Sequence, residues 1–250
     1  MINIIMHGCG GKMGQVVAEI VGNDDACQIV AGIDPRLPAV NFPVFATPAD
    51  CTVDADVIID FSTATAVPAL LEFSKAKNIP VVVCTTALSD ETTELLKETA
   101  KSVAVFKSAN MSVGINLLME LVQKAAQILY DANFDIEIVE KHHNQKIDAP
   151  SGTAMALADA INEAMDQQFH YVYDRSQTRE KRERKEIGIH AVRGGNIVGD
   201  HDVIFAGRDE VIELRHQATS REVFAVGAVK AAKYMAFKDP GFYSMKDVLA

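Results

Sequence analysis

The chain has 250 residues, of which 48% are hydrophobic and 23% are charged, and its formal net charge is −10 at pH 7. This length accommodates one large or two modest domains with substantial cores. The acidic balance argues against nucleic acid as a partner. No apolar run approaches the roughly 20 residues of a membrane span, so no membrane partner is expected.

The first residues and the cysteines indicate a cytoplasmic protein. The start Met-Ile-Asn-Ile is typical of a core strand rather than of a signal peptide. The cysteines are far apart and include no C-x-x-C pair, which favours reduced thiols over disulfides or a zinc site. We therefore expect no metal. The cysteines are Cys9, Cys27, Cys51 and Cys84.

A glycine-rich turn follows the first predicted strand. Residues 2–6 form an apolar run, residues 7–14 contain the turn, and residues 15–21 show helical spacing. Glycines at the first, fourth and seventh positions from Gly8 allow a tight turn, close approach of the backbone to a pyrophosphate, and close helix–strand packing. A second predicted strand, 28–33, ends at Asp34, where an acid would bind the adenosine ribose. This arrangement indicates a site for NAD or NADP.

Strands and helices alternate through the first hundred residues. Predicted strands at 57–61, 81–84 and 103–106 alternate with helices at 66–76 and after a cap at Ser89 or Asp90. Such alternation predicts a parallel, doubly wound sheet of the Rossmann type. Ligands of these sheets bind beyond the carboxyl ends of the strands. The hydroxyl-rich loops expected there are Ser62-Thr63, Thr85-Thr86 and Ser108-Ala109-Asn110.

The pattern changes after about residue 112, which indicates a second, inserted domain. We expect a dinucleotide-binding domain of residues 1–111 and 221–250, and an α+β substrate-binding domain of residues 112–220 with a mixed sheet. The charged run 174–186 is expected to be a solvated, mobile loop. The last three predicted strands, at 187–193, 201–206 and 211–217, have the spacing of antiparallel strands. The elements predicted after residue 112 are helices 116–130, 154–165 and 221–236, and strands 135–140, 187–193, 201–206 and 211–217.

Two histidines and a lysine precede a predicted helix start. His142, His143 and Lys146 lie in a five-residue window, and the segment 150–153, Pro-Ser-Gly-Thr, then begins a helical pattern. A helix start offers unpaired N–H groups and partial positive charge to an anion. The combination predicts a pocket for a small anionic substrate. Ser151 could instead be only a helix cap beside a surface loop, but capping explains neither the histidines nor the lysine.

The run from His142 to Ala154, His-His-x-x-Lys-x-Asp-Ala-Pro-Ser-Gly-Thr-Ala, resembles the signature of the 4-hydroxy-tetrahydrodipicolinate reductase (dihydrodipicolinate reductase) family. This family acts in the diaminopimelate branch of bacterial lysine synthesis. Further similar segments are Gly8–Gly14, 60–62, 85–86, 110–114 and 218–221. The resemblance implies NADH or NADPH as cofactor, a dicarboxylate substrate, a hinge between the domains, and a homotetramer built through the sheets of the second domain.

The resemblance also implies roles for individual residues. His142 would handle a proton, with Lys146 as partner cation or donor, and the sequence leaves open which of the two gives the proton. His143, Gly152 and Thr153 would hold the substrate carboxylates. The expected cofactor-binding residues are Gly8, Gly11, Lys12, Met13, Gly14, Asp34, Phe61, Cys84, Thr86, Ala109 and Met111.

Some positions depart from the family pattern. The family generally has glycines on both sides of the paired threonines, where this chain has Cys84 and Ala87. Many members carry a basic residue directly after the ribose-binding acid, where this chain has Pro35 followed by Arg36. The second departure leaves the choice between NADH and NADPH open.

Three other functions share some of these sequence features with a reductase. An NAD-dependent dehydrogenase of another small anionic amino or hydroxy acid would keep the glycine turn and a His/Lys pair. A nucleotide-sensing regulator would keep the fold but needs a DNA-binding module, which the sequence does not show. A scaffold protein would not require histidines and a lysine clustered before a helix start.

Overall fold

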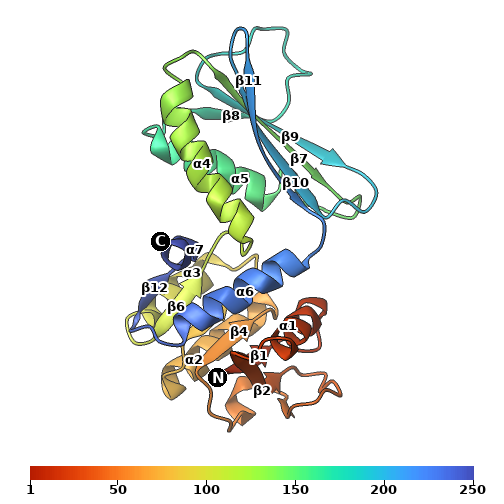
Figure 1. Ribbon diagram of the computed structural model, residues 1–250, viewed down its shortest axis with the longest axis vertical. Coiled ribbons are helices and arrows are strands. Elements are labelled where there is room, and N and C mark those ends of the chain that lie inside the picture. Colours follow the sequence, from red (N-terminus) through yellow and green to blue (C-terminus); the bar gives the residue numbers. More distant parts are fainter. The chain divides into compact units, whose positions relative to one another are not determined.

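The computed structural model describes residues 1–250, which form two compact units. Unit 1 comprises Met1–Ser112 and Glu222–Ala250, and unit 2 comprises Val113–Arg221. Unit 2 is therefore inserted in the sequence of unit 1, as the colours of Figure 1 show. All four cysteines carry free, buried thiols. None of the helices is long and apolar enough to span a bilayer.

Seven strands form the sheet of unit 1, in the order β12-β6-β5-β4-β1-β2-β3, and every pair is parallel. Strands β1 to β6 are arranged in the order of a doubly wound dinucleotide-binding sheet. The direction in which successive strands are added to the sheet reverses between β1 and β4. The predicted fold class is thereby confirmed. The strands are β1 (Ile2–His7), β2 (Cys27–Ile33), β3 (Val44–Phe45), β4 (Val57–Asp60), β5 (Val81–Val83), β6 (Ala104–Lys107) and β12 (Gly241–Tyr243).

Helices cover both faces of the unit 1 sheet. Successive strand residues point to opposite faces, so Ile4 of β1 packs in a core with α1 and α6, whereas Ile5 packs in a second core with α2 and α3. Ser89 caps α3 by accepting a hydrogen bond from Thr92 N at 3.2 Å. The helices are α1 (Lys12–Gly22), α2 (Val67–Lys77), α3 (Asp90–Thr99), α6 (Glu222–Met235) and α7 (Met245–Leu249), with short 3-10 turns η1 (Pro48–Asp50) and η2 (Ala64–Ala66).

Unit 2 has a mixed sheet of five strands, in the order β11-β10-β7-β9-β8. β10 is antiparallel to β7 and β11, but β9 is parallel to both β7 and β8. The expectation of antiparallel strands is therefore wrong for β9. The segment between β7 and β9 contains a helix, which supplies the long crossover that parallel pairing requires. The strands are β7 (Asp135–His142), β8 (His170–Val172), β9 (Glu186–Arg193), β10 (Gly199–Ala206) and β11 (Val211–Ala218).

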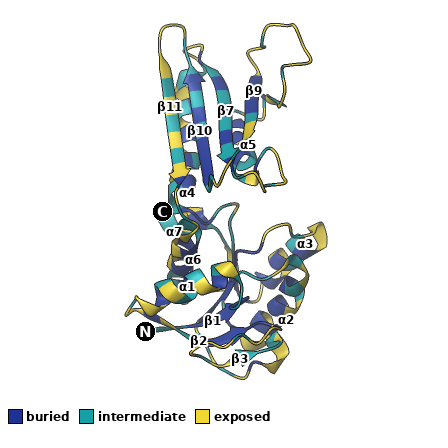
Figure 2. Cartoon of the chain, turned by 90° about the vertical axis from the view of Figure 1, so that its right-hand side faces the viewer, coloured by how far each residue is buried: buried dark blue, intermediate teal, exposed yellow.

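Two helices, α4 (Val113–Leu129) and α5 (Gly152–Ala164), pack on one face of the unit 2 sheet. Residues alternate between buried and partly exposed along β7, and between partly exposed and exposed along most of β11, as the colours of Figure 2 show. This period of two places Ile136, Ile138, Glu140 and His142 on the inner face of β7. The polar end of that row carries the predicted site.

The charged run before β9 is partly attached to the sheet. Arg175 pairs with Glu186 at 2.6 Å, and Arg182 pairs with Asp135 and with Glu137. The expected loop conformation is present over most of the run, since no helix or strand falls between β8 and β9. Its arginines nevertheless bind acidic side chains of the strands, which the mixed charge pattern by itself did not indicate.

Candidate active site

The glycine-rich turn lies between β1 and α1 in unit 1. Gly8 has a φ of 81°, and a Cβ there would lie 2.5 Å from the carbonyl oxygen of Phe61. A Cβ on Gly14 would lie 2.3 Å from the carbonyl oxygen of Gly8. Gly11 N donates to that same oxygen at 3.0 Å, which closes the turn. Only glycine therefore fits at the first and last positions of this turn.

Helix α1 begins directly after the turn and presents its amino end without a side-chain cap. Its cap residue Gly11 makes no side-chain hydrogen bond, and the first turn contains no acidic residue. Lys12 is exposed and Met13 is half-buried. Backbone N–H groups and the helix dipole together favour a phosphate at such a position. The geometry thus fits the pyrophosphate of a dinucleotide.

Asp34 follows β2, and its buried carboxylate has all its acceptor positions occupied within unit 1. It accepts from Gly10 N at 3.0 Å, from Arg36 N and Nε at 3.0 Å each, and from Arg36 Nη2 at 2.9 Å. The hydrogen bond from the Arg36 side chain is the main cause that lowers the pKa of Asp34 to about 2, and it outweighs the effect of burial. Ribose hydroxyls can bind this carboxylate only if Arg36 gives up part of its contact.

The other predicted cofactor residues of unit 1 follow the carboxyl ends of β4, β5 and β6. Phe61 is half-buried, and Thr86 and Ala109 are exposed, so their side chains are accessible. The side chains of Cys84 and Met111 instead lie in the hydrophobic core, with 8% and 6% exposure. Any contact of these two residues with a cofactor is therefore made through the backbone.

The two positions where the family generally has glycine differ in backbone conformation. Ala87 has a φ of 55°, which lies in the left-handed region that glycine adopts without strain. Cys84 has no such conformation, because the only non-glycine residues with positive φ are Leu37, Asn78, Ala87, Asn133, Asp166 and Gln167. The substitution is therefore strained at Ala87 but not at Cys84.

A buried polar row beneath these loops was not found from the sequence. His7 Nδ1 lies 2.8 Å from Asp60 Oδ1, which also accepts from Ser62 N at 3.1 Å. His7, Asp60 and Lys107 occupy one lateral row across the sheet, through the register of β1, β4, β5 and β6. Lys107 Nζ donates to Thr85 O at 2.8 Å, and burial lowers the pKa of Lys107. These contacts hold three of the loops at the strand ends.

In unit 2, His142 ends β7 and binds a fully buried carboxylate. His142 Nδ1 lies 2.6 Å from Glu140 Oε2. Arg193 of β9 donates to both oxygens of Glu140, each at 2.7 Å. Ser151 N donates to Glu140 Oε1 at 2.9 Å. One carboxylate thus connects the predicted proton-handling histidine to the cap of α5.

The start of α5 is accessible, as the anion-binding prediction requires. Ser151 is the cap residue, and its Oγ accepts from Ala154 N at 3.1 Å. Gly152 is exposed, and a Cβ there would meet no atom within 4 Å. Thr153 follows in the first turn. The cap is therefore present, and the exposed Gly152 directly follows it.

His143 and Lys146 share the turn that leads from β7 to α5. Lys146 N donates to His143 O at 3.1 Å, and His143 Nδ1 accepts from Gln145 N at 3.2 Å. Lys146 Nζ pairs with Asp148 Oδ1 at 2.8 Å. The ammonium is therefore held within the motif, by a carboxylate that is itself exposed.

His201 of β10 is a further buried group beside His142. Its Nε2 lies 3.0 Å from Ser151 Oγ, and its ring stands edge-on to that of His142, with 5.2 Å between centroids. Burial is the main cause that lowers the pKa of His201 to about 3. Glu140 could have been recognised from the sequence, because it lies two residues before His142 on the same strand face, but no sequence pattern indicates His201 or Arg193.

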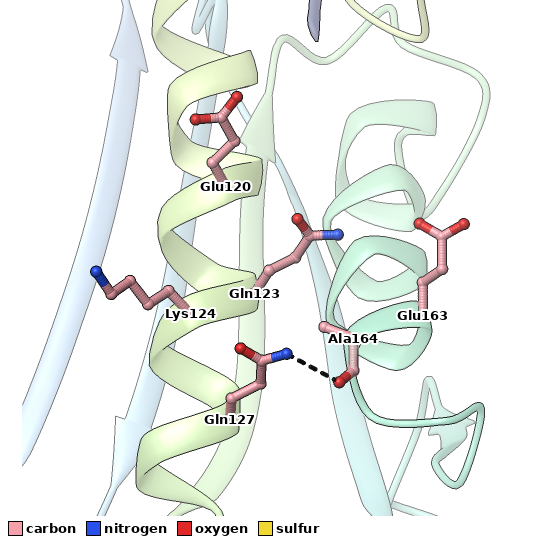
Figure 3. Close-up of a pocket in the computed structure, with 6 residues that line it drawn as sticks. All are labelled: Glu120, Gln123, Lys124, Gln127, Glu163 and Ala164. Atoms are coloured by element: carbon pink, nitrogen blue, oxygen red, sulfur yellow. Dashed lines mark hydrogen bonds between the residues drawn. The ribbon is translucent and has the colours of Figure 1, made fainter. Parts of the chain in front are cut away.

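An open groove of about 510 Å³ lies elsewhere in unit 2, between α4 and α5. Figure 3 shows Gln123 and Gln127 projecting from α4 towards α5, where Gln127 Nε2 donates to Ala164 O at 3.4 Å. The remaining lining residues are Glu120, Lys124 and Glu163. None of the predicted site residues lines this groove, and we assign it no function.

Family models and curated relatives match the chain throughout. Residues 2–111 match the model for the N-terminus of dihydrodipicolinate reductase, and residues 114–249 match the model for its C-terminus. The 4-hydroxy-tetrahydrodipicolinate reductase of Clostridium botulinum (strain Eklund 17B / Type B) is 53% identical, over 100% of this chain and 98% of the relative. The enzyme of that name from Caldanaerobacter subterraneus subsp. tengcongensis is 51% identical, with the same coverage.

Solved structures agree with these matches. The dipicolinate-bound dihydrodipicolinate reductase of Paenisporosarcina sp. TG-14 has a TM-score of 0.80 and 27% identity, covering 98% of this chain and 97% of that one. A probable dehydrogenase from Thermotoga maritima has a TM-score of 0.65 at 12% identity, covering 98% and 92%, and is similar in fold alone. The sequence, the fold and the matched models together place the chain in the dihydrodipicolinate reductase family.

Proposed function

We propose that this protein is a 4-hydroxy-tetrahydrodipicolinate reductase of the diaminopimelate route to lysine. It reduces its cyclic dicarboxylate substrate with NADH or NADPH, and the 4-hydroxyl of the substrate leaves as water. The observation that carries the proposal is the link from His142 through Glu140 to the start of α5. This link supports a single site in which His142 would handle a proton and the start of α5 would bind an anion. Relatives of that name at 53% and 51% identity support the reaction.

Unit 1 is proposed to bind the cofactor. When bound, a reduced nicotinamide supplies a hydride, and the protein supplies orientation and charge. The turn from Gly8 to Gly14 and the start of α1 would hold the pyrophosphate, with Lys12 beside it. Asp34 would accept hydrogen bonds from the adenosine ribose. The nicotinamide end would lie against the loops that contain Phe61, Thr86, Ala109, Cys84 and Met111, the last two acting through their backbones.

The substrate carboxylates are proposed to bind at the start of α5. The N–H groups of Gly152 and Thr153 would donate to one carboxylate, and His143 would contact a carboxylate as a third donor. An accessible helix start next to cationic side chains favours a small anion over a neutral ligand. The Paenisporosarcina reductase was solved with dipicolinate, a flat dicarboxylate, which supports this class of ligand.

Proton transfer is proposed to involve His142 and Lys146. Hydride addition to a conjugated imine leaves negative charge on nitrogen or on the neighbouring carbon, and this charge requires a proton. A histidinium or ammonium beside the ring is a suitable general acid. His142 contributes its Nε2 edge, because Nδ1 is bound to Glu140. Lys146 is the second cation, and either residue is a chemically suitable donor.

We further propose that the protein is a cytoplasmic homotetramer that assembles through the sheets of unit 2. The helices α4 and α5 cover only one face of that sheet. The other face carries exposed Val192 and Val211, with the half-buried Val139 and Ile204 between them. A surface of this kind is suited to pairing with the same face of another copy.

The proposed reaction is tested by comparing substrates under identical conditions. Freshly generated 4-hydroxy-tetrahydrodipicolinate should cause rapid oxidation of NADH or NADPH. Amino acids and hydroxy acids of similar size, tried in both reaction directions, should be turned over at least about 10³-fold more slowly, a difference of roughly 4 kcal/mol in transition-state stabilisation. Comparable turnover of one of these acids would instead identify the protein as another small-molecule dehydrogenase.

A further inference from the structure

The carboxylate of Glu140 has every acceptor position occupied, although the side chain is 0% exposed. Oε2 lies 2.6 Å from His142 Nδ1 and accepts from Arg193 Nη1 at 2.7 Å, and Oε1 accepts from Ser151 N at 2.9 Å and from Arg193 Nη2 at 2.7 Å. An ionised carboxylate offers about four acceptor positions. Three different segments of unit 2 are therefore joined at one buried group.

The hydrogen bonds keep this carboxylate ionised. Burial by itself raises the pKa of Glu140, but the bonds from His142, Arg193 and Ser151 outweigh it and lower the pKa to about 2. The Arg193 fork supplies the compensating charge that a buried carboxylate requires. At any pH at which the enzyme works, Glu140 therefore accepts hydrogen bonds and donates none.

An acceptor at this position determines the tautomer of His142. Since Glu140 cannot donate, the hydrogen between the two residues must reside on Nδ1 of His142. Nε2 is then the ring nitrogen that can take up or release a proton. A Cβ on Gly199 would lie 3.0 Å from this Nε2, so the edge of the ring is bordered by a residue without a side chain. The backbone of Gly199 thus packs closely against the proton-carrying atom, and a larger residue there would crowd it.

We propose that Glu140 is a positioning residue, which fixes the Nδ1–H tautomer of His142 and at the same time anchors the cap of α5 through Ser151 N. The inference rests on the proposed function, in which His142 handles a proton and α5 binds a carboxylate. Glu140 sets the two at a constant relative position, because one rigid group binds both. A displacement of about 1 Å between such groups is enough to impair catalysis severely.

Arg193 extends the same arrangement to the lysine. Its Nη2 donates to Asp148 O at 2.6 Å as well as to Glu140, so it also binds the turn that contains Lys146. The charged and titratable groups around His142 are therefore Glu140 on its own strand, Arg193 on β9, His201 on β10 and Lys146 in the turn. The Glu140 and Arg193 charges cancel, and burial keeps His201 neutral near pH 7.

The test uses Glu140→Gln, His142→Gln, the double variant, and Glu163→Gln as a matched control on the exposed side of α5. Glutamine keeps the size of the side chain but removes the charge that selects Nδ1–H. We expect kcat to fall about 10- to 100-fold in Glu140→Gln, as when a group that orients a functional histidine is lost. The control should retain wild-type kcat.

The double variant separates positioning from a general loss of structure. The amide oxygen of the introduced glutamine can still accept from Ser151 N, so Glu140→Gln mainly removes the action of Glu140 on His142. Glu140→Gln should therefore lower kcat by less than about 2-fold when His142 is already glutamine. A full further 10-fold loss in that background would show that Glu140 acts independently of His142, and the proposal would be wrong.

The tautomer itself is read by ¹⁵N NMR of protein labelled at histidine, with the His142 signals identified by their loss in His142→Gln. The wild type should show His142 protonated at Nδ1, and Glu140→Gln should show a shift towards Nε2–H. An Nε2–H tautomer in the wild type would overturn the proposal, and this reading needs no folded Glu140 variant. It also stands apart from the proposed function: normal kcat in His142→Gln would remove the proton role, while the spectrum would still decide whether Glu140 fixes the ring.

Discussion

The Arg36 guanidinium lies across the carboxylate of Asp34, with Nε 3.0 Å from Oδ1 and Nη2 2.9 Å from Oδ2. The carboxylate proposed to bind the adenosine ribose is thus already paired with Arg36, two residues later in the chain. The guanidinium side chain is 66% exposed, but the carboxylate side chain is only 3% exposed. A dinucleotide that binds Asp34 must therefore replace the hydrogen bonds that Arg36 makes to it.

This pair leads to a prediction about cofactor choice. Asp34 favours the free ribose hydroxyls of NADH and repels the 2′-phosphate of NADPH, whereas Arg36 and Lys12 attract that phosphate. We expect both cofactors to work, with NADH at least as good as NADPH. Asp34→Ala should lower the preference for NADH, and Arg36→Ala should raise it, as measured by kcat/KM for each cofactor. A wild type that prefers NADPH by more than about tenfold, roughly 1.4 kcal/mol, would show that the basic residues dominate.

A second prediction concerns the residues of the catalytic turn. His142→Gln and Lys146→Ala should each lower kcat by about 10²-fold or more, because each removes a candidate proton donor. The dissociation constant of NADH should change little, since the cofactor is assigned to unit 1. His170→Gln and Lys124→Ala are the matched controls at exposed positions of unit 2 and should keep wild-type kcat. Wild-type turnover in both site variants would remove these assignments.

The start of α5 provides a third prediction. Thr153→Pro deletes one N–H donor near the first turn, a position that tolerates proline in a helix, and should therefore raise KM for the substrate. Pyridine-2,6-dicarboxylate should inhibit the wild type competitively against the substrate, and less strongly in the variant. Competition against the nucleotide alone would place the carboxylate site elsewhere.

The backbone at Ala87 provides a fourth prediction, on stability. An alanine with a φ of 55° carries a strain of about 1–2 kcal/mol, which glycine would relieve at an entropic cost of about 0.4–1 kcal/mol. Ala87→Gly should therefore leave the free energy of unfolding unchanged or raise it by about 1 kcal/mol, measured by urea denaturation. Ala125→Gly, within α4, should lower it by about 1 kcal/mol. Equal losses in the two variants would mean that position 87 is unstrained.

The buried His201 provides a fifth prediction, on pH. The unfolded chain protonates this histidine as pH falls through about 6.5, whereas the folded protein holds its pKa at about 3. The folded pKa is the lower one, so stability is complete above pH 6.5 and declines towards pH 3, by up to about 1.4 kcal/mol per pH unit. Between pH 7 and pH 5 the wild type should lose about 1–2 kcal/mol more than His201→Gln. The exposed His170→Gln should keep the wild-type pH dependence, and equal slopes in all three proteins would contradict this account.

Glu140 does not complicate that experiment. Its pKa is lowered from 4.5 to about 2, so the stability that it contributes is present above pH 4.5 and is lost only below it. The change in stability between pH 5 and pH 7 therefore arises from His201 and the other histidines. Comparison with His201→Gln isolates the contribution of His201.

The parallel sheet of unit 1 was predictable because most of its strands are continuous apolar runs that alternate with helices. The pairing of β9 was not, because the spacing of strands along the chain does not determine their direction once a helix intervenes. The short β3, β8 and β12 have two or three residues each, too few to show a period. They were therefore missed.

In the site, likewise, residues close together in the sequence were predicted, whereas contacts between distant residues were not. His142, Lys146 and Ser151 belong to one continuous motif, and the sequence identified it. Arg193 is 53 residues from Glu140, and His201 is 50 residues from Ser151. Contacts at such separations depend on the order of strands in the sheet, which a single sequence does not specify. The pair of Arg36 with Asp34 spans only two residues, but its geometry depends on side-chain rotamers that follow from no pattern.

The stoichiometry of the reaction tests the proposed activity most directly. Purified protein is mixed with a limiting amount of freshly generated 4-hydroxy-tetrahydrodipicolinate and an excess of NADH or NADPH, and both nucleotide oxidation and the ring product are measured. We expect one nucleotide to be oxidised for each tetrahydrodipicolinate formed, with the rate reduced about 10²-fold or more in His142→Gln. Nucleotide oxidation without this product, or no oxidation with either nucleotide, would contradict the proposed activity.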